Sequence, residues 1–152
     1  RQRQMCIRDR GIVVAEKIAG LDPTPVDDVL VPKVTFCEPE IASVGLSEAE
    51  AAEIHGKENI TSAEFNVAGN AKSQILGTQG FVKLVSLKDG PILGFHAIGA
   101  RMGEQVGEGQ LMVSWEADAD DVAALVHAHP TQNETLGEAA MALAGKPLHN
   151  HG

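Results

Sequence analysis

Two of the six histidines lie in one short segment together with a proline and a carboxylate. The segment reads HAHPTQNE over residues 127–134. An imidazole takes up and releases a proton near neutral pH. A carboxylate bonded to one ring nitrogen fixes the tautomer and stabilises the charged ring, which leaves the other nitrogen free to move a proton. The segment therefore predicts acid–base chemistry at His129, assisted by Glu134.

The backbone around the proline places His129 at the start of a helix. Proline disfavours the α region for the residue before it, so His129 is expected in extended backbone, and Thr131 is a good N-cap. Thr131 and Glu134 also have the spacing of a capping box, in which the glutamate bonds the N-cap backbone N–H. The local sequence by itself favours that second interpretation. A metal site at His127 and His129 is a third, but no further ligand stands at a recognisable spacing, so we expect no metal.

The middle of the chain predicts a small antiparallel sheet. Strands are expected over residues 33–37, 41–45 and 60–65, and Asp89-Gly90 predicts a hairpin that joins residues 80–87 to 92–98. Ser47 and Glu50 form a capping box that opens a helix ending near His55. Residues 66–77 are expected to be irregular.

Helical patterns flank this sheet. One covers residues 11–20, and three more cover residues 103–116, 118–126 and 131–144. In the helix 103–116 the apolar side is expected to hold Val106, Gln110, Val113 and Ala117, with Leu111 and Trp115 extending it. Gly107 and Gly109 weaken this helix, which favours close packing there. The predicted fold is α+β: a mostly antiparallel sheet with helices packed on one face.

Composition narrows the classes of function. The chain has 152 residues and a net charge of −9, which argues against nucleic acid and against an anionic membrane surface as partners. There is no apolar run of membrane-spanning length and no visible signal peptide. Two distant cysteines do not make a disulfide framework, so a cytoplasmic location is expected. We expect Cys37 to be a buried or half-buried small residue.

Several motifs agree in order and spacing with one protein family. Besides the histidine segment they are VPKVTFCEPEIASVGLSE (31–48), GFVKLV (80–85) and LGFHAIG (93–99). Together they resemble the C-terminal interface domain of the FAD-dependent pyridine nucleotide-disulfide oxidoreductases. The similarity covers roughly residues 11–148 and is greatest to the branch that oxidises dihydrolipoyl groups. Glutathione, mycothiol-type and mercuric reductases and transhydrogenase share this domain and remain alternatives, as does a non-catalytic dimerisation module.

The resemblance implies a division of the chain. Residues 11–31 would be the end of a flavin-binding domain and its linker, 32–148 the dimerisation domain and 149–152 a tail. Residues 1–10, with four of the chain's five arginines, have no counterpart in the family, and we interpret them as a foreign segment. FAD and NAD would be bound mainly by domains absent from this chain, because the glycine-rich motifs and the redox-active cysteine pair are absent from it.

The resemblance also implies roles for individual residues. His129 would be the acid–base group, donated across a homodimer interface, and Glu134 would orient it. His127 and Pro130 would approach the partner's flavin, and the His129-Pro130 bond is a candidate for the cis form. Electrons from a dihydrolipoyl dithiol would pass through the cysteine pair and FAD to NAD. Lipoyl domains of 2-oxo acid dehydrogenase complexes would be the partners, and the fragment alone is expected to be inactive.

Overall fold

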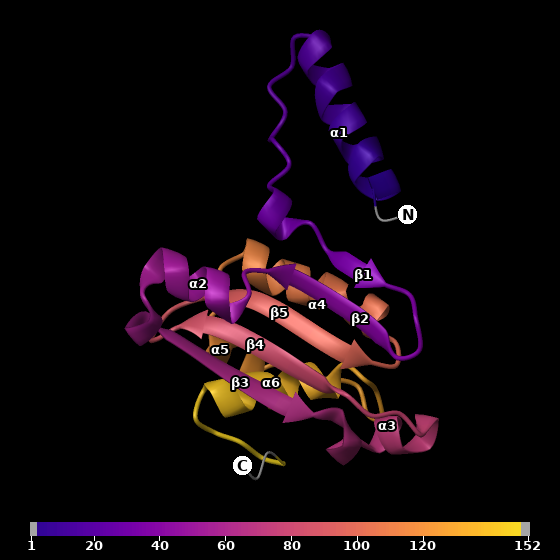
Figure 1. The fold of residues 1–152 in the computed structure, drawn as a ribbon, viewed down its shortest axis with the longest axis vertical. Helices are drawn as coiled ribbons and strands as arrows, with labels where there is room; N and C mark the ends of the chain where they lie inside the picture. The colour runs from indigo at the N-terminus through magenta and orange to yellow at the C-terminus, as the bar shows by residue number, and fades with distance from the viewer. Residues whose placement is uncertain (1–2, 150–152) are drawn as a thin grey trace.

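The computed structural model describes residues 3–149, so residues 150–152 of the predicted tail lie outside the described part. Helix α1 (Arg3–Ile18) stands away from a five-stranded sheet with its covering helices, and residues 19–32 connect the two (Figure 1). Gly20 follows the helix in a left-handed conformation, φ 79°, as its predicted capping position requires. The helix begins earlier than the sequence predicted, because arginine, glutamine and methionine in its first turns are good helix formers without any apolar periodicity.

The sheet is antiparallel throughout, with the order β1-β2-β5-β4-β3. The predicted hairpin forms its centre, and Asp89 at the turn adopts a positive φ of 55°. The strands are β1 (Lys33–Thr35), β2 (Glu40–Gly45), β3 (Ile60–Asn66), β4 (Phe81–Leu87) and β5 (Ile92–Gly99). The sequence predicted all five, with small errors at their ends.

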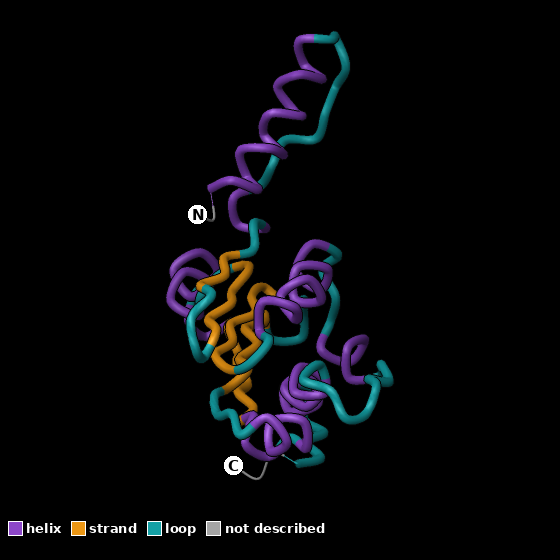
Figure 2. Tube along the Cα trace, turned by 90° about the vertical axis from the view of Figure 1, so that its right-hand side faces the viewer, coloured by secondary structure: helices purple, strands orange, loops and turns teal. Residues whose placement is uncertain are grey.

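Each face of the sheet has its own apolar cluster. The larger one includes Val82, Leu84 and Phe95, and it is covered by α4 (Met102–Ser114), α5 (Ala119–Ala123) and α6 (Glu134–Leu143). Figure 2 shows these helices on one side of the strands and α2 on the other. Helix α2 (Glu48–His55) packs there through a smaller cluster of Ala51, Ile60 and Val85. The α+β class is confirmed, and the main helical layer lies on one face as predicted.

Two short segments show how local side chains begin helices. Ser47 and Glu50 form the predicted capping box of α2, with Glu50 Oε2 accepting the Ser47 N–H at 2.8 Å. The prediction of irregular structure over 66–77 is wrong. That stretch holds a 3-10 turn (Val67–Gly69) and α3 (Ala71–Leu76), because Asn70 Oδ1 accepts the Ser73 N–H at 3.0 Å and caps the helix.

The buried side of α4 agrees with the predicted one in part. Val106 is buried and Val113 and Ala117 pack against the core as predicted, together with Met102 and Met112. Leu111 and Trp115, predicted to extend this side, are instead 49% and 76% exposed. The helix approaches the sheet along Gly109, where a Cβ would lie 2.7 Å from the ring of Phe95. Close packing is therefore confirmed at Gly109, and it turns Leu111 and Trp115 outward. Gly107 has open space beside it, so packing within this chain does not explain it.

Two further boundaries depart from the sequence analysis. Helix α5 ends at Ala123, so Leu125 and Val126 are outside it and are 58% and 98% exposed. Strand β1 ends at Thr35, which leaves Cys37 in the connection to β2. Cys37 is exposed rather than buried, and its thiol donates to the carbonyl of Pro39 at 2.9 Å. The strand is too short to carry Cys37 into the sheet.

Gly45→Ala should destabilise the chain strongly. Gly45 ends β2 with φ +82°, and a Cβ there would lie 2.2 Å from the carbonyl oxygen of Leu93. The backbone strain alone costs about 1–3 kcal/mol, and the clash adds to it. Urea denaturation measures the loss. Gly107→Ala is the matched control, since open space and helix propensity predict a gain of up to about 1 kcal/mol. Equal stability of the Gly45 variant and the wild type would contradict the expectation.

Candidate active site

The histidine segment forms a loop between α5 and α6. The His129 side chain is 69% exposed, and its Nδ1 lies 2.8 Å from Glu134 Oε1. The His129-Pro130 peptide bond is cis. Among residues 3–149 the structure gives the Nε2 atom of His129 no hydrogen-bond partner. The loop thus presents one ring nitrogen to the outside and ties the other to a carboxylate.

Glu134 makes both of the carboxylate contacts that the sequence left open. Its Oε1 bonds His129, and its Oε2 accepts the backbone N–H of Thr131 at 2.7 Å. Burial by itself would raise the pKa of Glu134, but the hydrogen bonds from Thr131 and His129 outweigh it and lower the pKa. Glu134 is therefore ionised at neutral pH, and an acceptor-only carboxylate places the proton on Nδ1 of His129.

Thr131 is not the N-cap that the sequence predicted. Its hydroxyl donates to the carbonyl of Ala128 at 2.6 Å, and α6 begins at Glu134 with Asn133 in the capping position. The hydroxyl is used inside the turn, so it is not available to the helix N–H groups. Of the two hydrogen bonds expected in the capping box, only the one from the Thr131 backbone N–H to the Glu134 carboxylate forms.

His127 is held by a carboxylate that the sequence analysis did not single out. Its Nε2 lies 2.8 Å from Glu108 Oε1, and the amide nitrogen of Asn133 donates to Glu108 Oε2 at 2.6 Å. The bond to Glu108 raises the pKa of His127 against the opposing effect of burial, and the bond from His127 lowers the pKa of Glu108. Glu108 comes from α4, so only the fold brings these three residues together.

A buried polar side chain anchors the loop to α3 and to the residue that follows β5. The Gln132 side chain accepts a bond from the Ser73 hydroxyl at 2.7 Å and donates to the carbonyl of Ala100 at 3.1 Å. Asn70 donates to the carbonyl of Thr131 at 3.1 Å. Gln132 is 4% exposed, and buried polar groups with complete partners fix a single conformation. The exposed His129 therefore sits on a rigid support.

The stability contributed by the His127–Glu108 pair should depend on pH. A raised histidine pKa contributes stability that is complete below the usual value of 6.5 and is lost as pH rises through the folded value. A lowered glutamate pKa contributes stability above 4.5 and loses it as pH falls through the folded value. The difference in unfolding free energy between wild type and Glu108→Gln should therefore be largest between these two pH values. A difference that urea denaturation shows to be constant from pH 4 to 9 would contradict this.

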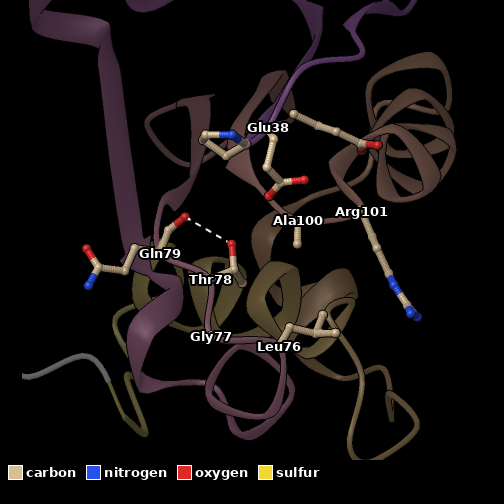
Figure 3. Close-up of a pocket in the computed structure, with 9 residues that line it drawn as sticks. Glu38, Leu76, Gly77, Thr78, Gln79, Ala100 and Arg101 are labelled. Carbon is tan, nitrogen blue, oxygen red and sulfur yellow. Dashed lines mark hydrogen bonds between the residues drawn. The ribbon is translucent and has the colours of Figure 1, made fainter.

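The described residues offer few other sites for chemistry. Residues 3–149 contain no group of three or more potential ligands that could hold a metal ion. A cavity of about 690 Å³ lies at the ends of β2 and β5, lined by Glu38, Pro39, Glu40, Leu76, Gly77, Thr78, Gln79, Ala100 and Arg101. In Figure 3 the guanidinium of Arg101 extends away from the carboxylate of Glu38. No residue of the histidine loop lines this cavity, so it is separate from the His129 site.

The matched family model carries the description pyridine nucleotide-disulphide oxidoreductase, dimerisation domain, and it covers residues 31–140. A dihydrolipoyl dehydrogenase from Bacillus subtilis is 40% identical over 91% of this chain, and one from Geobacillus stearothermophilus is 41% identical over 91%. The chain spans 29% of the length of each relative.

Among the described residues, no helix has the length and apolar character that a membrane span requires.

Two solved structures share the fold. LpdA from Mycobacterium tuberculosis has a TM-score of 0.78 at 20% identity, over 86% of this chain and 28% of that chain. The HOCl-induced flavoprotein disulfide reductase RclA from Escherichia coli has a TM-score of 0.77 at 20% identity, over 87% and 31%. With the motifs, the antiparallel sheet and the match over residues 31–140, the chain belongs to the pyridine nucleotide-disulfide oxidoreductase family and carries its dimerisation domain.

Proposed function

We propose that this chain is the interface domain of a homodimeric dihydrolipoyl dehydrogenase and that His129 is the acid–base residue of the partner subunit's active site. One observation carries the proposal: His129 is exposed, its Nδ1 is bonded to an ionised carboxylate, and its Nε2 is left to a group from outside the chain. The curated relatives named dihydrolipoyl dehydrogenase support the choice of substrate.

His129 acts as a base toward a dithiol. Its Nε2 takes the proton of a dihydrolipoyl thiol, and the thiolate attacks the redox-active disulfide of the other subunit. One cysteine leaves as a thiolate and a mixed disulfide forms, and His129 passes its proton to that leaving thiolate. His129 then takes the proton of the second substrate thiol. The resulting thiolate attacks the substrate sulfur of the mixed disulfide, closes the lipoyl disulfide and releases the other cysteine as a thiolate, so the substrate is oxidised and the cysteine pair reduced. Glu134 stabilises the imidazolium that arises between these steps.

The turn before α6 fits a position against a group on the partner. Ala128, His129 and Pro130 are exposed, and the buried contacts of Gln132 hold the turn from behind. His127 and Pro130 would lie beside the partner's flavin. FAD and NAD, bound mainly by domains absent from this chain, supply the electron transfer that follows reduction of the cysteine pair. Within the chain, residues 11–31 would end the flavin-binding domain and 32–148 form the interface domain.

Exposed apolar side chains next to this turn support a homodimer. Leu125 and Val126 directly precede His127, and Leu111 follows Glu108 by one turn of α4. Contact with a partner subunit would remove these apolar side chains from water. In a twofold dimer the same surface serves both subunits and brings two copies of His129 to two partner sites. Lipoyl domains of 2-oxo acid dehydrogenase complexes in the cytoplasm would deliver the substrate.

A substrate comparison tests the proposed activity. The full-length protein should reduce NAD⁺ with dihydrolipoamide far faster than it turns over glutathione disulfide, mycothiol disulfide or Hg²⁺ with a reduced nicotinamide. Spectrophotometry of the nicotinamide at 340 nm is the readout for all four. Preference for one of the other substrates would assign the protein to that sibling. Turnover of none of them by a flavin-loaded dimer would leave dimerisation as the function of this domain.

A further inference from the structure

We infer that Glu108 is a positioning residue: its carboxylate bonds both ends of the loop that carries His129 and so holds His129 in its working orientation. The inference deepens the proposed function and rests on it. Glu108 Oε1 lies 2.8 Å from His127 Nε2, at the start of the loop. Glu108 Oε2 lies 2.6 Å from the amide nitrogen of Asn133, at its end. Along the chain, His129 lies between these two attachment points, and Glu134 directly follows the second one.

The two hydrogen bonds of Glu108, to His127 and to Asn133, are here called the Glu108 clamp. The surroundings of the clamp leave its side chains little freedom to move. The side chains of Glu108 and His127 are 25% and 12% exposed, so both are largely shielded from water. The imidazole of His127 lies against Gly137 of α6, where a Cβ would be 2.8 Å from Nδ1. The ring of His127 therefore fills the space between the Glu108 carboxylate of α4 and the backbone of α6 at Gly137. No other residue at position 137 leaves that space open.

The two histidines of the His-x-His pair therefore have different roles. His127 is bonded through Nε2 and has its Nδ1 against Gly137, so its ring is used inside the protein. His129 is bonded through Nδ1 and turns Nε2 outward. The groups that face His127 are Glu108 from α4 and Glu134 from α6, and both raise its pKa. A charged His127 in turn helps to lower the pKa of Glu134, the partner of His129.

Loss of the clamp should affect turnover more than substrate binding. A displacement of about 1 Å in a reacting group can cost about 100-fold in rate, so we expect Glu108→Ala to lower kcat about 100-fold and Glu108→Gln about tenfold. The KM for dihydrolipoamide should change little, because Glu108 does not reach the substrate. Gly137→Ala should lower kcat as well, although alanine favours the helix. Glu104→Gln, on the same helix and exposed, is the matched control and should keep wild-type kcat.

Nitrogen NMR of the histidine rings gives a readout that a general loss of stability would not mimic. At a pH high enough to leave both rings neutral, His129 of the wild-type chain should show the tautomer protonated at Nδ1 and His127 the one protonated at Nε2. In folded Glu108→Gln or Gly137→Ala chains, His129 should lose that preference and show the mixed tautomers of a solvated imidazole. Unchanged His129 signals together with a wild-type kcat in both variants would overturn the inference.

The outcome for His129 separates this inference from the proposed function. If His129→Ala abolishes turnover while the Glu108 and Gly137 variants behave as wild type, only the positioning role fails. If His129→Ala keeps turnover, the proposed function itself fails. A kcat loss in Glu108→Gln that is matched by Glu104→Gln would also contradict the inference, because removal of any negative charge from α4 would then have the same effect.

Discussion

His129→Ala should lower dihydrolipoamide turnover of the full-length protein by roughly 10²–10⁴-fold, the usual contribution of general acid–base catalysis. The variant removes the only ring nitrogen that the histidine loop turns outward, since His127 is bonded to Glu108 through its own Nε2. Stopped-flow kinetics of flavin reduction by dihydrolipoamide measure the affected step directly. The His129 side chain is 69% exposed, so the fold and the bound flavin should be retained.

His149→Ala is the matched control for this variant. His149 is also an exposed histidine whose Nδ1 bonds a glutamate of α6, here Glu138 at 2.6 Å. It therefore reproduces the loss of an exposed histidine–glutamate pair outside the proposed site. It should keep wild-type turnover. Equal losses in the two variants, or none in His129→Ala, would remove His129 from its proposed role.

Substitution of Glu134 should have the second-largest effect, and two variants separate its two tasks. Glu134→Gln should lower turnover roughly 10- to 100-fold, less than His129→Ala, as loss of an orienting partner commonly does. Its amide oxygen can still accept the Thr131 N–H, so stability should change little. Glu134→Ala should show at least the same kinetic loss and should also lose about 1 kcal/mol of stability, because the Thr131 N–H loses its acceptor.

The comparison of stability with turnover decides whether Glu134 orients His129 or only holds the backbone of the turn at Thr131. Urea denaturation and steady-state kinetics of both Glu134 variants provide the two measurements. A stability loss in Glu134→Ala without any kinetic loss in either variant would mean that Glu134 only stabilises the turn before α6 through the Thr131 N–H. The structure predicts losses of both kinds, since Oε1 and Oε2 have different partners.

The parts of the fold that follow from neighbouring residues were predictable from the sequence. The capping box at Ser47 and Glu50 and the turn at Asp89-Gly90 are local, and both formed where the sequence predicted them. The exposed side of α4 was not predictable in this way. Leu111 and Trp115 extend the apolar pattern of that helix, yet Gly109 lets the helix settle on Phe95 and turns both side chains outward. Which side of a helix is buried depends on the surface it meets.

The same distinction applies to the candidate site. His129 and Glu134 are five residues apart, so their contact could be expected from the chain itself. Glu108 is 19 residues from His127 and has no motif around it, and its role became visible only when α4 was packed beside the loop. Its spacing of four residues from the buried Met112, which puts both residues on neighbouring positions of the helix surface, was the one available signal. Thr131 was wrongly predicted as the N-cap, because its hydroxyl donates to the carbonyl of Ala128, three residues before it, and does not bond a helix N–H group.

A mixed dimer tests the central proposal, that His129 serves the active site of the other subunit. One subunit carries His129→Ala, and the other has its redox-active cysteine pair replaced by serines; each variant alone forms an inactive homodimer. In the mixed dimer one site combines the intact cysteine pair of the first subunit with His129 of the second. We predict about half of the wild-type turnover per dimer, because one of the two symmetric sites is complete. A mixed dimer without turnover would contradict the proposal and place His129 in the site of its own subunit.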